Sequence, residues 1–402
     1  MKKIATSLPR PAKRPASYDK RIALVLQGGG ALGSYQAGVY EALSESDYVP
    51  DWISGISIGS INAAIIAGNA PEARVARLRE FWEGITAPSA CWPVSPGSPF
   101  SEISRLAGAI SALLFGQPGF FEPRNHLAWL TGMVPSSYYD TRALKATLER
   151  LVDFDRINAR ETRLSVEAVN VQTGNFCYFD SAEMAIRPEH IMASSAHPPG
   201  FPAIEIDGEF YWDGGLVSNT PLQYVLNYYP RRSTLAFQVD LFPSRGPLPR
   251  TLEQVSEREK EIRYSSRTRM GTDTLRDMHN IRHNLDALLD KLPGELKNTP
   301  EVEFLSAIAC VTTMDIAQLI YRPDEIQGSY KDYEFSRQSM QERWATGVSD
   351  TRLTLTASPW LEPAPPEVGA RTFDVAFDSR RPPALADQGH LALAPTRRTR
   401  AS

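Results

Sequence analysis

Residues 52–64 read WISGISIGSINAA, and this stretch decides which fold we expect for the chain. The apolar pair Trp52 and Ile53 is typical of a short strand, and the Ala- and Ile-rich segment from Ile58 has the spacing of a helix. Between them lies the pattern G-x-S-x-G, whose serine is Ser57. The sequence therefore predicts a strand, a sharp turn and a helix, with Ser57 at the apex of the turn.

A serine at such an apex is suited to nucleophilic catalysis. The turn forces it into a strained backbone conformation, and a side chain two residues before or after it would collide with the turn. Gly55 and Gly59 occupy those two positions. The helix that begins near Ile58 would direct its unpaired amides at an oxyanion formed beside Ser57. The alternative is a glycine-rich turn with a buried serine, because so short a pattern also arises by chance.

A glycine-rich loop precedes this motif. Residues 22–26 read IALVL, which is typical of a strand buried on both faces of a parallel sheet. The loop QGGGALG follows at residues 27–33, and a helix is expected from there to Leu43. Adjacent glycines can turn their amides outward and form a nest for negative charge at a helix N-terminus. The oxyanion donors expected beside Ser57 are the amides of Gly28, Gly29 and Gly30.

The same loop also matches the dinucleotide-binding fingerprint G-x-G-x-x-G, which ends here at Gly33. That fingerprint requires an acidic residue about 20 positions later, at the end of a second strand. The acidic residues in rough range are Glu45, Asp47 and Asp51. The second strand leads into the Ser57 turn instead, so the oxyanion interpretation is favoured and no cofactor is expected.

A candidate catalytic acid follows a later strand. Residues 210–212 form the exit strand of a hairpin and run directly into Asp213, Gly214 and Gly215. An α/β sheet places catalytic acids at the carboxyl ends of its strands. The alternative is a turn aspartate that caps nearby amides, and this segment alone leaves both interpretations open.

Composition excludes some classes of protein. The chain has 402 residues, of which 42% are hydrophobic and 22% charged, as expected of one large globular domain or two. A net charge of −4 argues against a nucleic-acid-binding protein. Both ends are basic and contain proline, which favours solvated tails, and docking on anionic lipid is the alternative.

The cysteines and the apolar segments bear on localisation. Cys91, Cys177 and Cys310 are far apart and form no C-x-x-C pair, which indicates reduced thiols in a cytoplasmic protein. No apolar signal region precedes Ile22, and no stretch reaches the ~18 apolar residues of a spanning helix. The most apolar helix expected, over residues 100–115, is interpreted as a core helix, with a lid, an acyl-chain wall or an interfacial contact as alternatives.

Residues 252–292 are dominated by charged residues at helical spacing, which is typical of a long solvated helix or a helical pair. His279 and His283 lie four positions apart there and could bind a metal from one face. Neither a third ligand nor a glutamate-bearing motif accompanies them. A surface pair is therefore favoured, and no metal site is expected.

Taken in order, the motifs at residues 28–33, 55–59 and 213–215 give the chain a resemblance to the patatin-like phospholipase family. Residues 193–198, Ala-Ser-Ser-Ala-His-Pro, look like the family's Ala-Ser-x-Ala-x-Pro segment. The resemblance implies an α/β protein with a three-layer α/β/α fold and a mainly parallel central sheet, plus a helical C-terminal extension. The expected divisions are a basic disordered tail over 1–20, an acyl hydrolase domain over 21–241, an extension of unknown role over 242–357 and a disordered tail over 358–402.

What the resemblance implies for function is a Ser-Asp dyad that cleaves carboxylic esters of lipids. Ser57 would be the nucleophile and Asp213 its base, and an acyl-Ser57 intermediate would pass its acyl group to water or to another acceptor. The amides of Gly29, Gly30 and Ile58 would form the oxyanion hole. The supporting motif residues would be Gly33, Gly55, Gly59, Gly214, Gly215 and Asn219, the last of which would hold the aspartate loop.

One departure and two alternatives accompany this hypothesis. Many family members carry Arg or Lys where this chain has Leu32, and a cation there would favour an anionic substrate or brace the loop. A Ser-His-Asp triad would need a histidine after Asp213, and the available ones are His279, His283 and His390. The second alternative is a non-catalytic module that binds lipid or a partner protein. The partners expected are thus a lipid or acyl ester, with peripheral membrane contact as an option and no nucleic acid.

Overall fold

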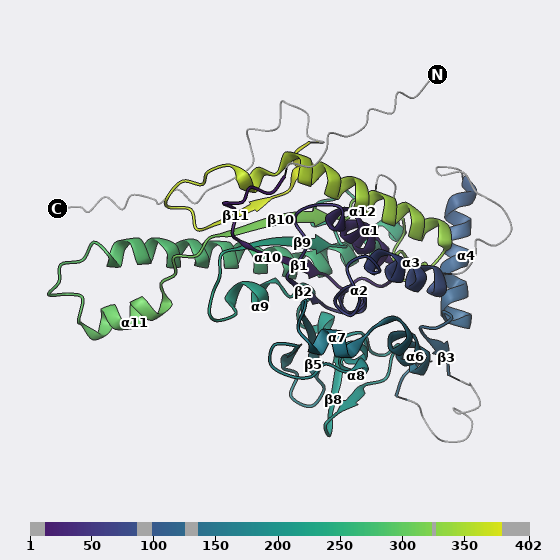
Figure 1. Ribbon diagram of the computed structural model, residues 1–402. Helices are drawn as coiled ribbons and strands as arrows, with labels where there is room; N and C mark the ends of the chain where they lie inside the picture. The colour runs from purple at the N-terminus through teal and green to yellow at the C-terminus, as the bar shows by residue number, and fades with distance from the viewer. Residues whose placement is uncertain (1–12, 87–98, 125–135, 324–326, 380–402) are drawn as a thin grey trace.

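A mixed nine-stranded sheet forms the centre of the protein (Figure 1). The computed structural model describes residues 13–86, 99–124, 136–323 and 327–379. The strand order is β11-β10-β9-β1-β2-β5-β8-β7, and β6 pairs with β5. The strands that run parallel are β1 (Arg21–Leu26), β2 (Trp52–Gly55), β5 (Arg163–Asn170), β9 (Thr234–Asp240), β10 (Met314–Ile320) and β11 (Ala370–Phe373). The antiparallel pairs join β5 to β6 (Phe176–Asp180) and β8 (Glu209–Asp213), and β8 to β7 (Ile204–Ile206).

Helices cover both faces of this sheet. The side chains of β1 alternate between the two layers: Ile22 and Leu24 pack in one hydrophobic core, and Ala23 and Val25 in the other. The helices are α1 (Ser34–Ser44), α2 (Ile58–Ala67), α3 (Arg74–Ile85), α4 (Pro99–Phe115), α6 (Arg142–Leu151), α7 (Phe154–Asn158), α8 (Pro188–Ser194), α9 (Leu222–Asn227), α10 (Leu252–Leu289), α11 (Pro300–Ile308), α12 (Arg337–Ala357) and α13 (Val375–Asp378). Helices α1, α2 and α12 share the first core, and α9 lies in the second. The three-layer α/β/α fold and the helical C-terminal region are therefore confirmed.

Short elements complete the fold. The 3₁₀ turns are η1 (Gly30–Gly33), η2 (Gly214–Leu216) and η3 (Pro359–Leu361), and a two-stranded sheet joins β3 (Glu122–Pro123) to β4 (Tyr139–Asp140). Turn η1 connects β1 to α1, and η2 follows β8 directly. Both sites proposed from the sequence thus lie where a strand ends and a turn begins.

Helix α12 packs directly on α1, as Figure 1 shows. A Cβ atom at Gly38 would lie 2.0 Å from the Trp344 carbonyl oxygen, and one at Gly347 would lie 2.2 Å from the Tyr35 carbonyl oxygen. The two backbones therefore approach more closely than any side chain would allow. This contact fixes a late part of the chain against the helix that follows the glycine loop.

The expected tails are shorter than the sequence suggested. Residues 358–379 contain η3, β11 and α13, and residues 13–20 contact the body of the protein. Asp315, which is buried in β10, holds a residue from each of these segments. Its carboxylate lies 2.7 Å from Lys20 of the N-terminal segment and 2.9 Å from Arg371 of the C-terminal segment. Such distant partners leave no local signal, and so both segments read as basic tails. Residues 1–12, Cys91, His390 and the rest of the expected C-terminal tail lie outside the described residues.

Helix α10 is not solvated on all sides, which corrects a second expectation. It has a buried polar stripe: Glu257, Glu261, Ser265, Thr268, Thr272 and His279. Thr268 accepts a hydrogen bond from Gln27 at 2.9 Å, and Thr272 donates to Gln238 at 3.2 Å. The stripe is polar because it faces polar side chains, Gln27 just after β1 and Gln238 in β9, and this is why the sequence resembles that of an exposed helix.

The prediction that His279 and His283 form a surface pair is wrong for His279. His279 is buried, and its Nε2 lies 2.7 Å from the Thr312 carbonyl oxygen. His283 Nε2 lies 3.1 Å from the Pro366 carbonyl oxygen. Both rings therefore contact the segments around β10 and β11. Within the described residues, no group of His, Cys, Asp and Glu side chains is arranged to hold a metal ion.

Candidate active site

Ser57 lies between the end of β2 and the start of α2, at a backbone φ of 56°. A positive φ costs a non-glycine residue about 1–3 kcal/mol and persists only where the surroundings hold it. Here the Ser57 amide donates to the Ser194 carbonyl oxygen at 3.0 Å, and the Ser195 hydroxyl donates to the Ser57 carbonyl oxygen at 3.2 Å. The segment before β7 therefore holds the strained turn in place.

The glycines on either side of Ser57 are required by close backbone contacts. A Cβ atom at Gly55 would lie 2.3 Å from the Gly59 carbonyl oxygen, and one at Gly59 would lie 2.4 Å from the Leu26 carbonyl oxygen. Both distances are too short for any side chain. The G-x-S-x-G pattern is thus used here as a tight strand-to-helix turn, as the sequence predicted.

Asp213 faces Ser57 from the end of β8. Strands β2 and β8 pair with the same edge of β5, and β6 pairs with the opposite edge. On that edge β2 ends at Gly55, opposite Val166, and β8 ends at Asp213, opposite Ala168, so the ends of the two strands meet. Ser57 and Asp213 line the same cavity, the Ser57 side chain is close enough to lower the pKa of the Asp213 carboxyl group, and the Gly215 amide donates to Asp213 Oδ1 at 2.7 Å. Asp213 is almost completely buried. This burial raises the pKa of Asp213, and the nearby His197, the Ser57 side chain and the Gly215 amide partly oppose the increase.

His197 is a site residue that the sequence reasoning missed. Its Nδ1 lies 3.8 Å from Asp213 Oδ2, and its side chain is half-exposed in the cavity beside Ser57. The triad alternative considered only histidines that follow Asp213 in the chain. Neither His279 nor His283 lines this cavity. The signal for it in the sequence is the Ala-Ser-Ser-Ala-His-Pro segment at residues 193–198, which contains His197.

Glu167 is a second buried carboxyl group near the site, and it was also missed. The Tyr178 hydroxyl donates to Glu167 Oε2 at 2.5 Å, and a Cβ atom at Gly214 would lie 2.7 Å from the Glu167 carbonyl oxygen. Burial raises the pKa of Glu167 to about 8. At neutral pH the group is therefore mostly uncharged and adds little negative charge beside Asp213.

The amides of the glycine loop divide into engaged and available groups. The Gly28 amide donates to the Asn219 carbonyl oxygen at 3.3 Å, and the Ala31 amide donates to the Asp332 carbonyl oxygen at 2.7 Å. The expectation that Gly28 is an oxyanion donor therefore needs correction, because its N–H is already used to hold the Asn219 loop. Across the described residues, no acceptor is found for the amides of Gly29, Gly30 and Ile58.

Asn219 connects the two loops. Its Nδ2 donates to the Gly28 carbonyl oxygen at 3.4 Å, and a Cβ atom at Gly215 would lie 3.2 Å from its Oδ1. Asn219 thus touches both the glycine loop and the turn that follows Asp213. Gly33 lies further along the first loop, where a Cβ atom would lie 2.7 Å from the Ile58 side chain.

A cavity of about 390 Å³ opens beside Ser57 and Asp213. Most of its wall is apolar, and the aromatic residues that line it are Phe120, Phe121, Tyr139, Phe201, Phe242, Tyr264, Tyr333 and Phe335. The described lining residues include no Lys or Arg. Residues after position 241 contribute Phe242, Tyr264, Asp332, Tyr333 and Phe335, a contribution that the sequence did not predict. The cavity suits an uncharged, apolar chain next to a hydroxyl nucleophile.

Helix α4 forms part of this wall and also an exposed ridge. Ala112 and Leu113 line the cavity, and Ala109 is buried. The outer face carries apolar side chains exposed by 46–76%: Leu106, Ile110, Leu113, Leu114 and Phe115. The core-helix interpretation is therefore right only for the face of α4 that carries Ala109 and Ala112. The alternative of an acyl-chain wall agrees with the contacts of Ala112 and Leu113 with the cavity.

Comparison with known protein families agrees with this geometry. A family model described as patatin-like phospholipase matches residues 24–226, which is half of the chain and includes Ser57 and Asp213. The chain belongs to the patatin-like phospholipase family. A second model, described as patatin phospholipase, matches residues 262–367. The family resemblance inferred from the sequence is confirmed, and the region after residue 241 has a patatin-phospholipase match of its own.

Relatives of this patatin-like protein include fungal proteins. Patatin-like phospholipase domain-containing proteins of Chaetomium globosum and Neurospora crassa are 48% and 49% identical to it over 52 residues, 13% of this chain and 6% of each relative. The matched segment thus spans a small fraction of those relatives' length. Among solved structures, VipD from Legionella pneumophila aligns with 87% of this chain and 70% of its own, at 13% identity and a TM-score of 0.36. Human GIVD cytosolic phospholipase A2 aligns with 40% of this chain and 22% of its own, at 16% identity and a TM-score of 0.23.

Proposed function

We propose that the protein is a serine acyl hydrolase that cleaves carboxylic esters of lipids, with Ser57 as nucleophile and Asp213 as base. The observation that carries this proposal is that Ser57 and the buried Asp213 line the same apolar cavity, with the Ser57 side chain close enough to the Asp213 carboxyl group to lower its pKa. Family membership agrees with it, because the family is named for phospholipases.

The first half of the reaction forms an acyl-enzyme. Ser57 Oγ attacks the ester carbonyl carbon while Asp213 accepts the hydroxyl proton, which its raised pKa favours. The negative charge that develops on the carbonyl oxygen would be stabilised by the amides of Gly29, Gly30 and Ile58, which have no acceptor among the described residues. As the tetrahedral intermediate collapses, the bond to the alkoxy oxygen breaks, and Asp213 returns the proton to the departing alcohol.

The second half releases the acyl group. A water molecule takes the place of the alcohol, Asp213 accepts one of its protons, and the water oxygen attacks the acyl carbon. Collapse of the second intermediate frees the carboxylic acid and returns the proton to Ser57. An alcohol in place of water would give a new ester, so the same residues would also support acyl transfer.

The substrate we infer is a neutral acyl ester. Aromatic and aliphatic side chains fit an acyl chain, and the lack of Lys and Arg among the described lining residues gives an anionic headgroup no partner there. We also infer peripheral contact with lipid surfaces through α4. Leu113 of its exposed ridge also lines the cavity, so a lipid could pass from such a surface to Ser57 without crossing water. In the described part of the chain, no helix is both long and apolar enough to cross a bilayer.

The test is labelling by a fluorophosphonate together with turnover of a panel of acyl esters and phospholipids. Ser57→Ala should abolish both, and Asp213→Asn should reduce both by at least about 100-fold. The matched control is Asp207→Asn, because Asp207 is an exposed aspartate in the turn before β8. Full activity of Asp213→Asn would contradict the dyad. Lipid binding by Ser57→Ala, combined with no turnover of any ester by the wild type, would instead favour a non-catalytic lipid-binding module.

A further inference from the structure

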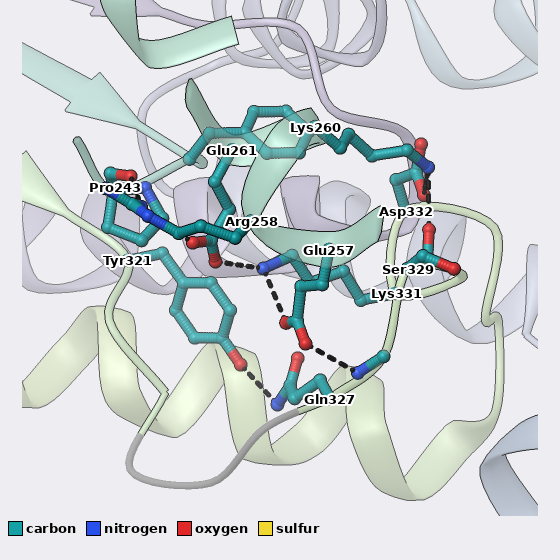
Figure 2. Close-up of polar contacts among 12 residues, drawn as sticks. Pro243, Glu257, Arg258, Lys260, Glu261, Tyr321, Gln327, Ser329, Lys331 and Asp332 are labelled. Atoms are coloured by element: carbon teal, nitrogen blue, oxygen red, sulfur yellow. Dashed lines mark hydrogen bonds and ion pairs between the residues drawn. The ribbon is translucent and has the colours of Figure 1, made fainter. Parts of the chain in front are cut away.

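The loop at residues 327–335 lies between β10 and α12 and forms hydrogen bonds and ion pairs with charged residues of α10 (Figure 2). Lys331 is 1% exposed, and its Nζ lies 2.9 Å from Glu257 and 2.5 Å from Glu261. The second carboxylate oxygen of Glu257 accepts the Gly328 amide at 3.1 Å. Lys260 adds contacts of 2.7 Å to the Ser329 carbonyl oxygen and 2.8 Å to Asp332. Three charged residues from successive turns of one helix thus hold a single loop.

Arg343 of α12 holds the same loop from the other side. Its guanidinium is buried and donates to the carbonyl oxygens of Lys331 at 3.1 Å and Glu334 at 3.0 Å. It also donates to the Ala31 carbonyl oxygen at 3.2 Å. Arg343 therefore connects the loop at residues 327–335 directly to the glycine loop beside Ser57. It brings a cation to the glycine loop, which has the apolar Leu32 at the next position.

The loop in turn fixes the backbone of the glycine loop. The Asp332 carbonyl oxygen accepts the Ala31 amide at 2.7 Å, and it lies so close to Gly30 that a Cβ atom there would be 2.1 Å away. Gly30 has a φ of 54°. The contact thus occupies the amide after Gly30, whereas the amides of Gly29 and Gly30 have no acceptor within the part of the chain that the structure describes.

Buried ion pairs are a weak source of stability, because desolvation of the charges offsets most of their attraction. Their directional hydrogen bonds can still select one backbone arrangement among several. We propose that Glu257, Glu261, Lys331 and Arg343 are positioning residues for the oxyanion hole, acting through the Asp332 carbonyl oxygen. This inference rests on the proposed function, and it gives the region after residue 241 a role in the reaction. The donors would then be arranged before a substrate binds, which is when preorganisation is most effective.

The key variants keep the volume of the cluster and remove its directional bonds. They are Arg343→Lys and the neutral triple variant Glu257→Gln, Lys331→Met, Glu261→Gln. The control is Arg276→Met, because Arg276 lies on the same helix and forms its ion pairs with Asp273 and Asp277 of that helix rather than with the loop. Folding is checked by thermal unfolding, and each protein is assayed per active site titrated with a fluorophosphonate.

The decisive measurement compares two inhibitors of the same shape. A trifluoromethyl ketone forms an oxyanion on Ser57, and the matching ether does not. We expect the key variants to bind the ketone about 10- to 100-fold more weakly, to lose a similar factor in kcat, and to bind the ether within about 2-fold of the wild type. A variant that only folds less well would weaken the binding of the ketone and of the ether by the same factor. If its folded fraction stayed intact, neither affinity would change once it is expressed per titrated active site. An unchanged ratio of ketone to ether affinity would overturn the inference.

Amide hydrogen exchange gives a readout that does not depend on activity. In the Ser57→Ala background, exchange in the peptide that contains Ala31 should be at least about 10-fold faster in the key variants than in Arg276→Met. If the wild type turned over no ester, the proposed function would fail, and faster exchange would still show that the cluster braces the loop. If the wild type were active and both the inhibitor ratio and the exchange were unchanged, only the positioning role would fail.

Discussion

His197 Nδ1 lies 3.8 Å from Asp213 Oδ2, and both groups line the cavity beside Ser57. A protonated imidazole at this distance stabilises the carboxylate and so lowers the pKa of Asp213 against the effect of burial. The proposed mechanism needs Asp213 ionised. Activity should therefore be lost as the pH falls through the pKa of Asp213.

Replacing His197 with Asn should shift this loss of activity to higher pH, because the charge that lowers the pKa of Asp213 is removed. The measurement is kcat/KM against pH with a soluble short-chain ester. His283→Asn is the control, since His283 contacts the Pro366 carbonyl oxygen away from the cavity. Complete loss of activity at every pH would instead assign His197 the role of the base and favour a triad.

Glu167→Gln should change how stability depends on pH. The folded protein holds the Glu167 proton up to about pH 8, whereas an unfolded chain releases it near its ordinary pKa, about 4.5. Between these values the unfolded state binds fewer protons, so this group makes wild-type stability fall as the pH rises. The variant should therefore gain roughly 4 kcal/mol more relative to the wild type at pH 8.5 than at pH 5. Urea unfolding at both values tests this, with the exposed Glu205→Gln as the control; parallel pH dependence in wild type and variant would contradict it.

Gly30→Ala should damage the site more than its backbone angle alone would. Alanine at a positive φ costs about 1–2 kcal/mol, and the added Cβ would also meet the Asp332 carbonyl oxygen at 2.1 Å. Gly174→Ala provides the comparison, because Gly174 has a φ of 71° and nothing within 4 Å. We expect Gly174→Ala to lower the free energy of unfolding by about 1 kcal/mol with normal kcat. Gly30→Ala should cost at least about twice that and should lower kcat at least about 10-fold. Equal effects of the two substitutions on stability and kcat would contradict this prediction, because they would mean that the loop with Asp332 moves away from the new Cβ atom at little cost.

Charge on the exposed ridge of α4 should separate lipid surfaces from soluble esters. Leu114→Glu and Phe115→Glu place carboxylates on side chains that are 63% and 76% exposed and do not line the cavity. We expect at least about 10-fold weaker sedimentation with neutral phosphatidylcholine vesicles and a similar loss of turnover of vesicle-borne ester. Turnover of a soluble short-chain ester should stay within about 2-fold of the wild type. Leu288→Glu, on the exposed side of α10, is the control. Unchanged vesicle binding would remove α4 from the lipid contact.

The parts of this protein that local patterns predict are those built by neighbouring residues. The strand, turn and helix around Ser57 could be predicted because Gly55 and Gly59 complete a short local pattern. The contact that requires Gly55 is local, at the Gly59 carbonyl oxygen, although the contact that requires Gly59 is with Leu26 of β1. The same holds for Asp213, which follows a recognisable hairpin. The parallel strand at residues 22–26 was also recognisable, because burial on both faces leaves a continuous apolar run.

What could not be predicted depends on partners distant in sequence. The Asp332 carbonyl oxygen that holds Ala31 is a main-chain atom, and no side-chain pattern identifies it. Helix α10 was misread because a face that meets polar residues of the sheet has the composition of a face that meets water. The strand β11 is only four residues long, and its neighbourhood is rich in Pro and Arg, so composition indicated a tail.

The place of β1 in the sheet has a consequence for synthesis on the ribosome. Its neighbours are β2, which is made soon afterwards, and β9, which spans residues 234–240. Until β9 emerges, one edge of the most apolar strand of the nascent chain has no partner, and such edges promote aggregation. We therefore expect the unfinished polypeptide to need shielding by chaperones during most of its translation.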